Sequence, residues 1–338
     1  MDRHNSRGHI SLHSLGISDS GSICDRKWMT SVKIPRTQSI INPNFFIDLP
    51  DKKLLFKKSV AHGTFGRIDL AERKTVSGTT NVFVKRPILP GQSLFYEACI
   101  QKLTRNSLDR GGFDAGTPDI YDIFKLSDNS TCFTMEIFRN SKTLWETLTA
   151  VDSREFDTIL KICLIQICGM TWYLHNDIGI NHRDLKPSNI LIGRTSSHVK
   201  RTYTIRDNSV KVDTPFHIAF IDYGFCCIGN PGTSSPALSL GSVYDKRDPC
   251  PKSGRDMYQL LSFIYTEFRF KMSATILNLF EKWLNTGDYS ITQLIKKHAG
   301  AGAGSCDNWI YLISGDPSIR QFQCSNPHVI LQDLAALV

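Results

Sequence analysis

The residues best suited to chemistry lie in one short run, which reads HRDLKPSNIL at positions 182–191. Within six positions it carries a carboxylate on Asp184, an ammonium on Lys186 and an amide oxygen on Asn189. Asp184 could accept a proton from an attacking hydroxyl or orient it. Lys186 could balance charge on a transferred phosphoryl group, and Asn189 offers a hard oxygen for Mg²⁺. The competing explanation is an ordinary helix-to-strand loop, in which the aspartate caps a helix end and the asparagine stabilises a turn. So specific a combination of residues makes this explanation less favoured.

A second segment contains two glycines and lies between two expected strands. It comprises Val60, Ala61, His62, Gly63, Thr64, Phe65, Gly66, Arg67 and Ile68. Glycines at these places would let the backbone come close to the phosphates of a nucleotide. The signal is weak by itself, because a turn in an unrelated hairpin could carry the same glycines.

Two further charged positions follow expected strands. Lys85 ends the apolar strand Val82–Val84, and an ammonium on a rigid strand can neutralise phosphate if an acidic residue holds it in place. Glu97 is the candidate for that residue. Asp222 ends the apolar stretch Ile218–Ile221, where it suits a second metal ligand. Each signal is weak by itself, because most lysines such as Lys85 are solvated on the surface and an aspartate such as Asp222 is common in turns after strands.

The elements that must position these residues follow from the spacing of apolar side chains. Alternation over Leu54–Lys85, 120–124 and 132–137 predicts a small antiparallel sheet, with a helix over 93–103. Further helices are expected over residues 159–174, 257–268 and 274–283. The sequence therefore predicts an α+β fold, sheet-rich first and mainly helical afterwards.

Composition sets broader bounds. The chain has 338 residues, 41% of them hydrophobic, and its formal charge of +8 is scattered, so the charge identifies no partner. The ten cysteines show neither paired metal spacing nor a compact disulfide framework, which favours a reducing compartment. We expect no signal peptide, because charged residues and histidines interrupt the first 16 positions before an apolar stretch could form. We also expect no membrane span, because the longest apolar run, around Leu260–Tyr265, is too short. Residues 1–50 are polar and are expected to form a flexible tail.

In this order, the four segments resemble the eukaryotic-type protein kinase family: a glycine-rich loop, a strand lysine, the HRDLKPSN catalytic loop and an Asp-x-Gly metal motif. The resemblance covers about Leu54 to Phe268. It implies a bilobal domain over 51–338, with ATP between a small sheet-rich lobe, about 51–138, and a larger helical lobe, about 139–338. The part after about Lys296 matches nothing in the family.

Carried across by position, the resemblance assigns a role to each candidate. Lys85 would contact the ATP phosphates and pair with Glu97, and Asp184 would be the catalytic base. Asn189 and Asp222 would hold Mg²⁺. The string Asp-Leu-Lys-Pro, which contains Lys186, is similar to the serine/threonine version of the loop.

Two more positions take their interpretation from the resemblance. The segment Met135–Phe138, with Glu136, is similar to the hinge that hydrogen-bonds adenine through its backbone. Asp256 stands where the family keeps an aspartate that braces the catalytic loop.

The sequence also departs from the family pattern. Ala61 replaces the first loop glycine, and Tyr223 replaces the usual phenylalanine before Gly224. An insertion over 193–215 is expected to extend a surface hairpin. The short spacing from Lys85 to Glu97 suggests a trimmed helix. No Ala-Pro-Glu closes the presumed activation segment, Asp222 to Pro251.

Three hydroxyls in that segment are possible modification sites. They are Thr233, Ser234 and Ser235. A phosphate on one of them could pair with Arg183 and order the segment.

The leading functional hypothesis is transfer of the ATP γ-phosphoryl group to serine or threonine of protein substrates, with Mg²⁺. We expect no need for nucleic acid or a membrane anchor, and a cytoplasmic or nuclear location. A pseudokinase scaffold is the alternative, suggested by Ala61, the missing Ala-Pro-Glu and the short helix region. A small-molecule kinase of related fold is a third. The divergent carboxyl-terminal part suggests a large DNA virus as the source, and hence also the virion as a location.

Overall fold

A computed structural model describes residues 29–30, 46–49, 52–63, 66–126, 128–138, 140–229, 238–241, 244–245, 247–287, 290–298 and 308–337. The chain divides into two compact units. Unit 1 comprises Met1–Leu103 and Asp119–Ile137, and unit 2 comprises Thr104–Pro118 and Phe138–Val338. Residues 104–118, which the sequence analysis placed in the first lobe, therefore belong to the second unit.

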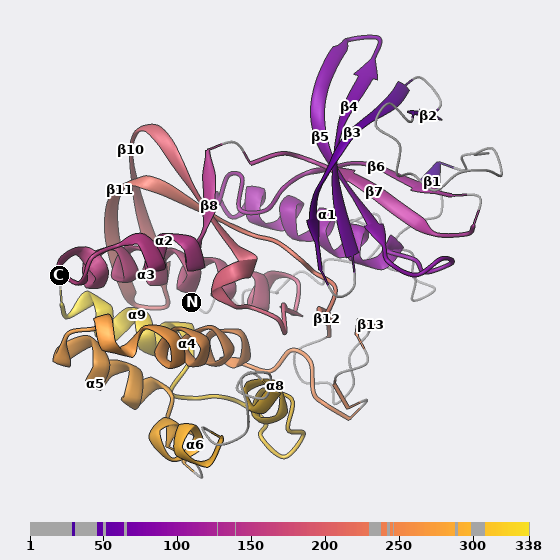
Figure 1. Cartoon of the computed structure of the whole chain (residues 1–338). Coiled ribbons are helices and arrows are strands. Elements are labelled where there is room, and N and C mark those ends of the chain that lie inside the picture. Colours follow the sequence, from indigo (N-terminus) through magenta and orange to yellow (C-terminus); the bar gives the residue numbers. More distant parts are fainter. Residues whose placement is uncertain are drawn as a thin grey trace, which may run out of the picture. The chain divides into compact units, whose positions relative to one another are not determined.

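Unit 1 contains a seven-stranded sheet in the order β1-β6-β7-β5-β4-β3-β2 (Figure 1). Its strands are β1 (Met29–Thr30), β2 (Phe46–Leu49), β3 (Lys52–His62), β4 (Gly66–Thr75), β5 (Gly78–Pro87), β6 (Ile120–Lys125) and β7 (Thr131–Met135). Strand β1 pairs with β6 in parallel, and the other neighbours are antiparallel. Helix α1 (Phe95–Arg110) begins in this unit and ends in unit 2.

One hydrophobic cluster of unit 1 lies on one face of the sheet. It is formed by Ile47, Leu49, Leu54, Phe56, Ala71, Val82, Val84, Phe124 and Cys132. Because side chains alternate along a strand, the burial of Val82 and Val84 on this face directs Phe83 and Lys85 to the other face. The apolar alternation thus sets the direction of the candidate lysine.

The prediction of a flexible tail over residues 1–50 is wrong for the parts of it that the structure describes. Strand β1 pairs with β6, and β2 pairs with β3 with Ile47 and Leu49 buried. Such short strands give too little alternation to stand out in a polar stretch. The rest of the predicted tail lies outside the described residues.

Unit 2 is mainly helical. Its helices are α2 (Leu144–Ala150), α3 (Ser153–Asp177), α4 (Arg255–Phe268), α5 (Ala274–Trp283), α6 (Ile291–His298), α8 (Asn308–Ser314) and α9 (Pro327–Ala335), with 3-10 turns η3 (Pro187–Asn189) and η4 (Arg269–Lys271). Its strands are β8 (Ser141–Thr143), β9 (Ile180–Asn181), β10 (Ile190–Ile205), β11 (Asn208–Phe220), β12 (Cys227–Ile228) and β13 (Leu238–Ser239). They form two small sheets, β11-β10-β8 and β13-β12-β9. The predicted α+β class is confirmed.

Helix α3 is the longest helix described. The Asp152 side chain caps its start by accepting hydrogen bonds from the backbone N–H groups of Arg154 and Glu155. By length and composition alone α3 could cross a membrane, a possibility that the sequence analysis overlooked. In the structure 61% of its most apolar window is buried, as in a helix at the centre of a helical layer.

The insertion over 193–215 forms most of a long hairpin of β10 and β11, as predicted. The strands pair from Ile190 with Phe220 to Ile205 with Asn208. One face is buried, however, because a Cβ atom added to Gly169 of α3 would lie 2.6 Å from the Tyr203 ring. The hairpin is therefore partly core and only partly surface.

Candidate active site

In unit 1 the structure brings Lys85 and Glu97 together. The Lys85 ammonium on β5 forms an ion pair with the Glu97 carboxylate in the first turn of α1, and the two side chains are only 12% and 6% exposed. Helix α1 has 16 residues. The prediction of a trimmed helix is therefore wrong, because the short spacing moves Glu97 to the start of the helix and leaves its length intact.

The glycine-containing segment forms the turn between β3 and β4. The Gly63 N–H donates to the Gly66 carbonyl at 2.8 Å. A Cβ atom at Gly66 would lie 2.9 Å from Cε of Lys85, so glycine lets this backbone lie directly against the lysine side chain. The turn and the lysine are thus neighbours within one sheet. Thr64 and Phe65 lie outside the described residues.

The residues on either side of this turn differ in their exposure and in their contacts. Val60, Ala61 and His62 are exposed at the end of β3. Ile68 pairs with Lys85 across β4 and β5. The Arg67 guanidinium lies 3.1 Å from the Asp69 carboxylate, so this side chain already has a partner within the sheet.

The hinge-like segment is tied to β6. The Glu136 N–H donates to the Asp119 carbonyl at 2.9 Å, and the Glu136 carboxylate accepts from the Asp119 N–H at 3.2 Å. Both groups serve contacts within unit 1. The Glu136 N–H is therefore not the group that would bind adenine.

In unit 2 the predicted catalytic loop lies between β9 and β10, and three predicted residues meet at one carboxylate. Asp184 is 2% exposed. The Asn189 side-chain amide donates to Oδ2 of Asp184 and to its carbonyl oxygen, each at 2.9 Å. The Lys186 ammonium lies 3.1 Å from Oδ1 of Asp184. This arrangement holds a carboxylate beside a partly exposed cation, which suits it to accept a proton near developing negative charge.

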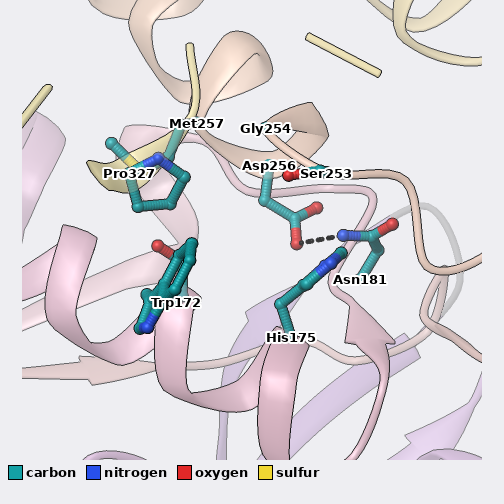
Figure 2. Close-up of a pocket in the computed structure, with 9 residues that line it drawn as sticks. Trp172, His175, Asn181, Ser253, Gly254, Asp256, Met257 and Pro327 are labelled. Carbon is teal, nitrogen blue, oxygen red and sulfur yellow. Dashed lines mark hydrogen bonds between the residues drawn. The ribbon is translucent and has the colours of Figure 1, made fainter. Parts of the chain in front are cut away.

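Asp256 braces the loop from α4, in the place that the resemblance implied. Its carboxylate accepts hydrogen bonds from the backbone N–H groups of His182 and Arg183, both at 2.9 Å, and from the Asn181 amide at 3.2 Å. Figure 2 shows Asp256 and Asn181 at the edge of a small pocket with His175. Burial lowers the pKa of His175, against the opposing effect of Asp256. The brace is 73 residues away in sequence from Arg183.

Asp222 lies beside Asn189 through the pairing of β10 and β11. The register places Ile190 opposite Phe220, and the Ile221 N–H donates to the Asn189 carbonyl at 3.0 Å. Asp222 is exposed and has a φ of 68°. An aspartate in this left-handed region is strained, and such strain clusters at functional sites. Asn189 and Asp222 thus offer two oxygen donors at neighbouring positions, which fits Mg²⁺ chemistry.

Arg183 is occupied by the segment that follows Gly224. Its guanidinium donates to the Phe225 carbonyl at 2.6 Å, the Ser239 hydroxyl at 2.8 Å and the Leu240 carbonyl at 2.5 Å. It is 1% exposed, and desolvation, followed by nearby Arg255, lowers its pKa to about 10. The predicted phosphate sites Thr233, Ser234 and Ser235 lie outside the described residues. Arg183 therefore already binds three described residues of this segment, Phe225, Ser239 and Leu240, without a phosphate.

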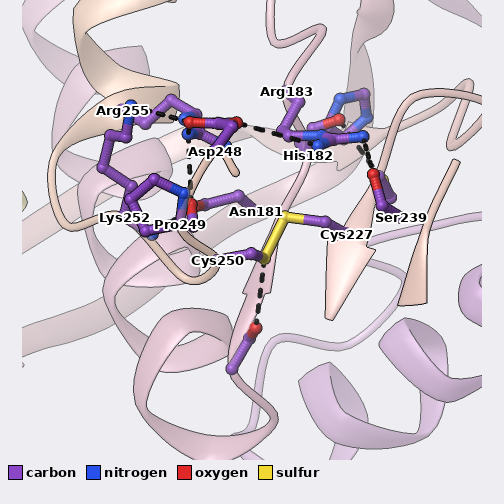
Figure 3. Close-up of a disulfide and its surroundings, with 12 residues drawn as sticks. Asn181, His182, Arg183, Cys227, Ser239, Asp248, Pro249, Cys250, Lys252 and Arg255 are labelled. Carbon is purple, nitrogen blue, oxygen red and sulfur yellow. Dashed lines mark hydrogen bonds and ion pairs between the residues drawn. A yellow bond between two sulfur atoms is a disulfide. The ribbon is translucent and has the colours of Figure 1, made fainter. Parts of the chain in front are cut away.

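A buried charge cluster stands at the end of that segment, where Ala-Pro-Glu is missing (Figure 3). The Asp248 carboxylate forms ion pairs with Lys252 at 2.8 Å and with Arg255, and it lies 3.8 Å from Arg183. All four side chains are almost fully buried. Asp248, Lys252 and Arg255 lie within eight residues of one another. The cluster was missed because charged side chains so close in sequence are usually solvated.

A disulfide joins Cys227 of β12 to Cys250, 23 residues later (Figure 3). The cysteine spacing did not predict it. It closes a loop over the same segment that Arg183 holds. Such a closure restricts the unfolded chain, which favours the folded loop.

Sequence reasoning also missed Tyr311 of α8. Its hydroxyl donates to Oδ1 of Asp184, 127 residues away. The only available signal was the amphipathic spacing around Trp309 and Ile310, which are buried. That spacing predicts a helix but not its contact with the loop.

No protein-family model matches the chain. It is 30% identical over 221 residues to a probable serine/threonine-protein kinase of Dictyostelium discoideum, a match that covers 61% of this chain and 46% of that protein. It is 21% identical over 304 residues to a probable serine/threonine protein kinase of Arabidopsis thaliana, covering 88% of this chain and 20% of that protein. The chain thus spans less than half the length of these relatives.

Two solved structures match the chain over most of its length. The BubR1 kinase domain has 14% sequence identity and a TM-score of 0.49, with 86% of this chain and 92% of that chain covered. Vaccinia related kinase 3 has 12% identity and a TM-score of 0.48, with 89% and 92% covered.

Both sequence relatives are named as probable serine/threonine kinases. The chain is thus similar in sequence to members of the eukaryotic-type protein kinase family, the family that its four motifs resemble in their order.

Proposed function

We propose that the protein transfers the γ-phosphoryl group of ATP to serine or threonine hydroxyls of protein substrates. The observation that carries the proposal is the array at Asp184, whose carboxylate receives both Asn189 and Lys186. Burying a carboxylate costs free energy, and partners such as Asn189 and Lys186 offset that cost. Buried, paired carboxylates of this kind are often found at functional sites. The two curated relatives, both named as probable serine/threonine kinases, support the same reaction.

The residues in each unit fit a nucleotide and its metal. Lys85, held by Glu97, would bind phosphate oxygens, with the backbone of the Gly63 to Gly66 turn close by. Asn189 and the exposed carboxylate of Asp222 would hold Mg²⁺. When bound, ATP supplies the phosphoryl group, and Mg²⁺ neutralises part of its charge.

Within unit 2, Asp184 orients the substrate hydroxyl and accepts its proton as the new bond forms. Asn189 fixes the direction of the carboxylate through its 2.9 Å hydrogen bond. Lys186, whose side chain is 32% exposed, reaches the loop surface and balances the negative charge that develops there. The chain's contribution is mainly position and charge, as expected for phosphoryl transfer.

The proposal is tested by transfer of radiolabel from Mg²⁺ and ATP to a mixed protein substrate, followed by phosphoamino-acid analysis. We compare the wild type with Lys85→Met, and use Lys74→Met, an exposed lysine of the same sheet, as the control. We expect label on serine or threonine that Lys85→Met removes and Lys74→Met leaves unchanged. Absence of transfer by folded wild-type protein would favour the scaffold alternative.

A further inference from the structure

The base Asp184 has a partner from far along the chain. The Tyr311 hydroxyl of α8 donates to Oδ1 of Asp184, and the Lys186 ammonium lies 3.4 Å from that hydroxyl oxygen, close enough to donate to it. A phenol hydroxyl can donate one hydrogen bond and accept another. Tyr311 therefore links the ammonium to the carboxylate in one directed chain, in addition to their 3.1 Å ion pair.

Helix α8 is fixed within unit 2 by buried contacts. The Ser314 carbonyl at its end accepts hydrogen bonds from Lys252 and Arg255, both at 3.1 Å, and the Ser314 hydroxyl accepts one from Gln259 at 2.9 Å. The Tyr311 ring packs edge-on against Phe263 of α4, with centroids 5.9 Å apart. These contacts are characteristic of a fixed support and not of a lid.

The hydrogen bonds on Asp184 leave a defined place for a substrate. A carboxylate oxygen accepts about two hydrogen bonds. Among the described residues, Oδ1 faces Lys186 and Tyr311, whereas Oδ2 receives the Asn189 side chain alone. The second acceptor position of Oδ2 is thus the one that a substrate hydroxyl can use.

We propose that Tyr311 is a positioning residue for phosphoryl transfer, which fixes the Asp184 carboxylate so that Oδ2 faces the substrate hydroxyl. The proposal rests on the proposed function. Removing the hydroxyl leaves Oδ1 with Lys186 alone and lets the carboxylate rotate, which slows the chemical step. It leaves the nucleotide contacts of unit 1 in place.

The test compares Tyr311→Phe with wild type in full-length protein, measuring kcat, the KM for ATP and the melting temperature. We expect kcat to fall about 10-fold or more, from loss of one hydrogen bond to a charged group, with the KM for ATP and the melting temperature nearly unchanged. Tyr265→Phe is the matched control, because the Tyr265 hydroxyl donates to Glu281 at 2.8 Å in the same unit, away from the loop. It should leave kcat unchanged.

The outcomes are distinct. An unchanged kcat in Tyr311→Phe, with active wild type, overturns the positioning role. A faster Tyr311→Phe also overturns it, because the hydroxyl would then obstruct the base. A parallel fall of kcat and melting temperature in both variants would show a structural effect only. Inactive wild-type protein would instead contradict the proposed function.

Discussion

The two units hold their candidate residues in different ways. In unit 1 Lys85 is held by an ion pair to Glu97, between a strand and the first turn of the next helix. In unit 2 Asp184 is held by Asn189, Lys186 and a residue from α8, and the surrounding loop by Asp256 from α4. The support of Lys85 thus comes from an element that is close in the sequence, whereas much of the support of Asp184 comes from helices that are far away in it.

Among the residues that support Lys85 and Asp184, the largest expected effect is from Asp256→Ala. The substitution leaves the buried N–H groups of His182 and Arg183 and the Asn181 amide without their carboxylate. We expect the free energy of unfolding to fall by about 3 kcal/mol, and transfer to fall by about 100-fold or more. Urea unfolding and transfer assays on the same preparation measure both.

The control for this variant is Asp207→Asn, in the exposed turn of the β10 and β11 hairpin. It should change neither quantity. If Asp256→Ala lost stability but kept full activity, Asp256 would not be needed to position the catalytic loop.

Glu97→Gln tests how Lys85 is held in unit 1. The substitution removes the charge that holds the Lys85 ammonium, so we expect kcat/KM for ATP to fall about 10-fold. Stability should fall as well, by about 3 kcal/mol, because the buried Lys85 ammonium loses its carboxylate partner. Glu72→Gln is the matched control, because Glu72 forms an ion pair with Lys57 on the same sheet, at 3.1 Å. Equal losses of ATP use in both variants would remove the special role of Glu97.

The buried Lys252, which contacts the end of α8, makes the stability of unit 2 depend on pH. Desolvation, with repulsion from Arg255, lowers the pKa of Lys252 to about 8 in spite of Asp248 and Asp316, and its ordinary value is 10.5. Between these values the unfolded state binds more protons, so stability rises with pH. The cost of burying the charge is present in full below about pH 8.

The measurement for this prediction is the free energy of unfolding of wild type and of Lys252→Met between pH 7.5 and 10. The difference between the two should move in favour of wild type by about 1 to 3 kcal/mol as pH rises. Subtracting the variant removes the other groups that titrate there. A difference that stays constant would show that the pKa of Lys252 is not lowered.

The smallest effect is expected for Tyr223→Phe, which restores the residue usual in the family. The buried Tyr223 hydroxyl donates to the Phe220 carbonyl at the long distance of 3.5 Å. Its loss should change stability by less than about 1 kcal/mol and leave transfer unchanged. Thermal unfolding would detect a larger change, which would show that the hydroxyl supports the metal motif.

The elements of the fold were predictable where the apolar pattern was long. The helix over 274–283 matches α5, and the strands over 120–124 and 132–137 match β6 and β7 within a few residues. Strand β2 was missed because four residues carry too short an alternation in a polar stretch. The long α3 was predicted, but its membrane-like composition was not noticed.

The candidate site was predictable where its chemistry is written in one segment. Asp184, Lys186 and Asn189 meet as their spacing suggested. Tyr311 and the pairing of Cys227 with Cys250 could not be predicted, because each contact joins distant segments and depends on how the helical unit packs. Local periodicity does not contain that information.

The central claim is that the array at Asp184 performs the chemical step. Its most direct test is the rate of phosphoryl transfer by Asp184→Asn at saturating Mg²⁺ and ATP, in protein whose ATP affinity equals that of wild type. We expect the rate to be lower by about 1000-fold. A rate equal to that of wild type would contradict it.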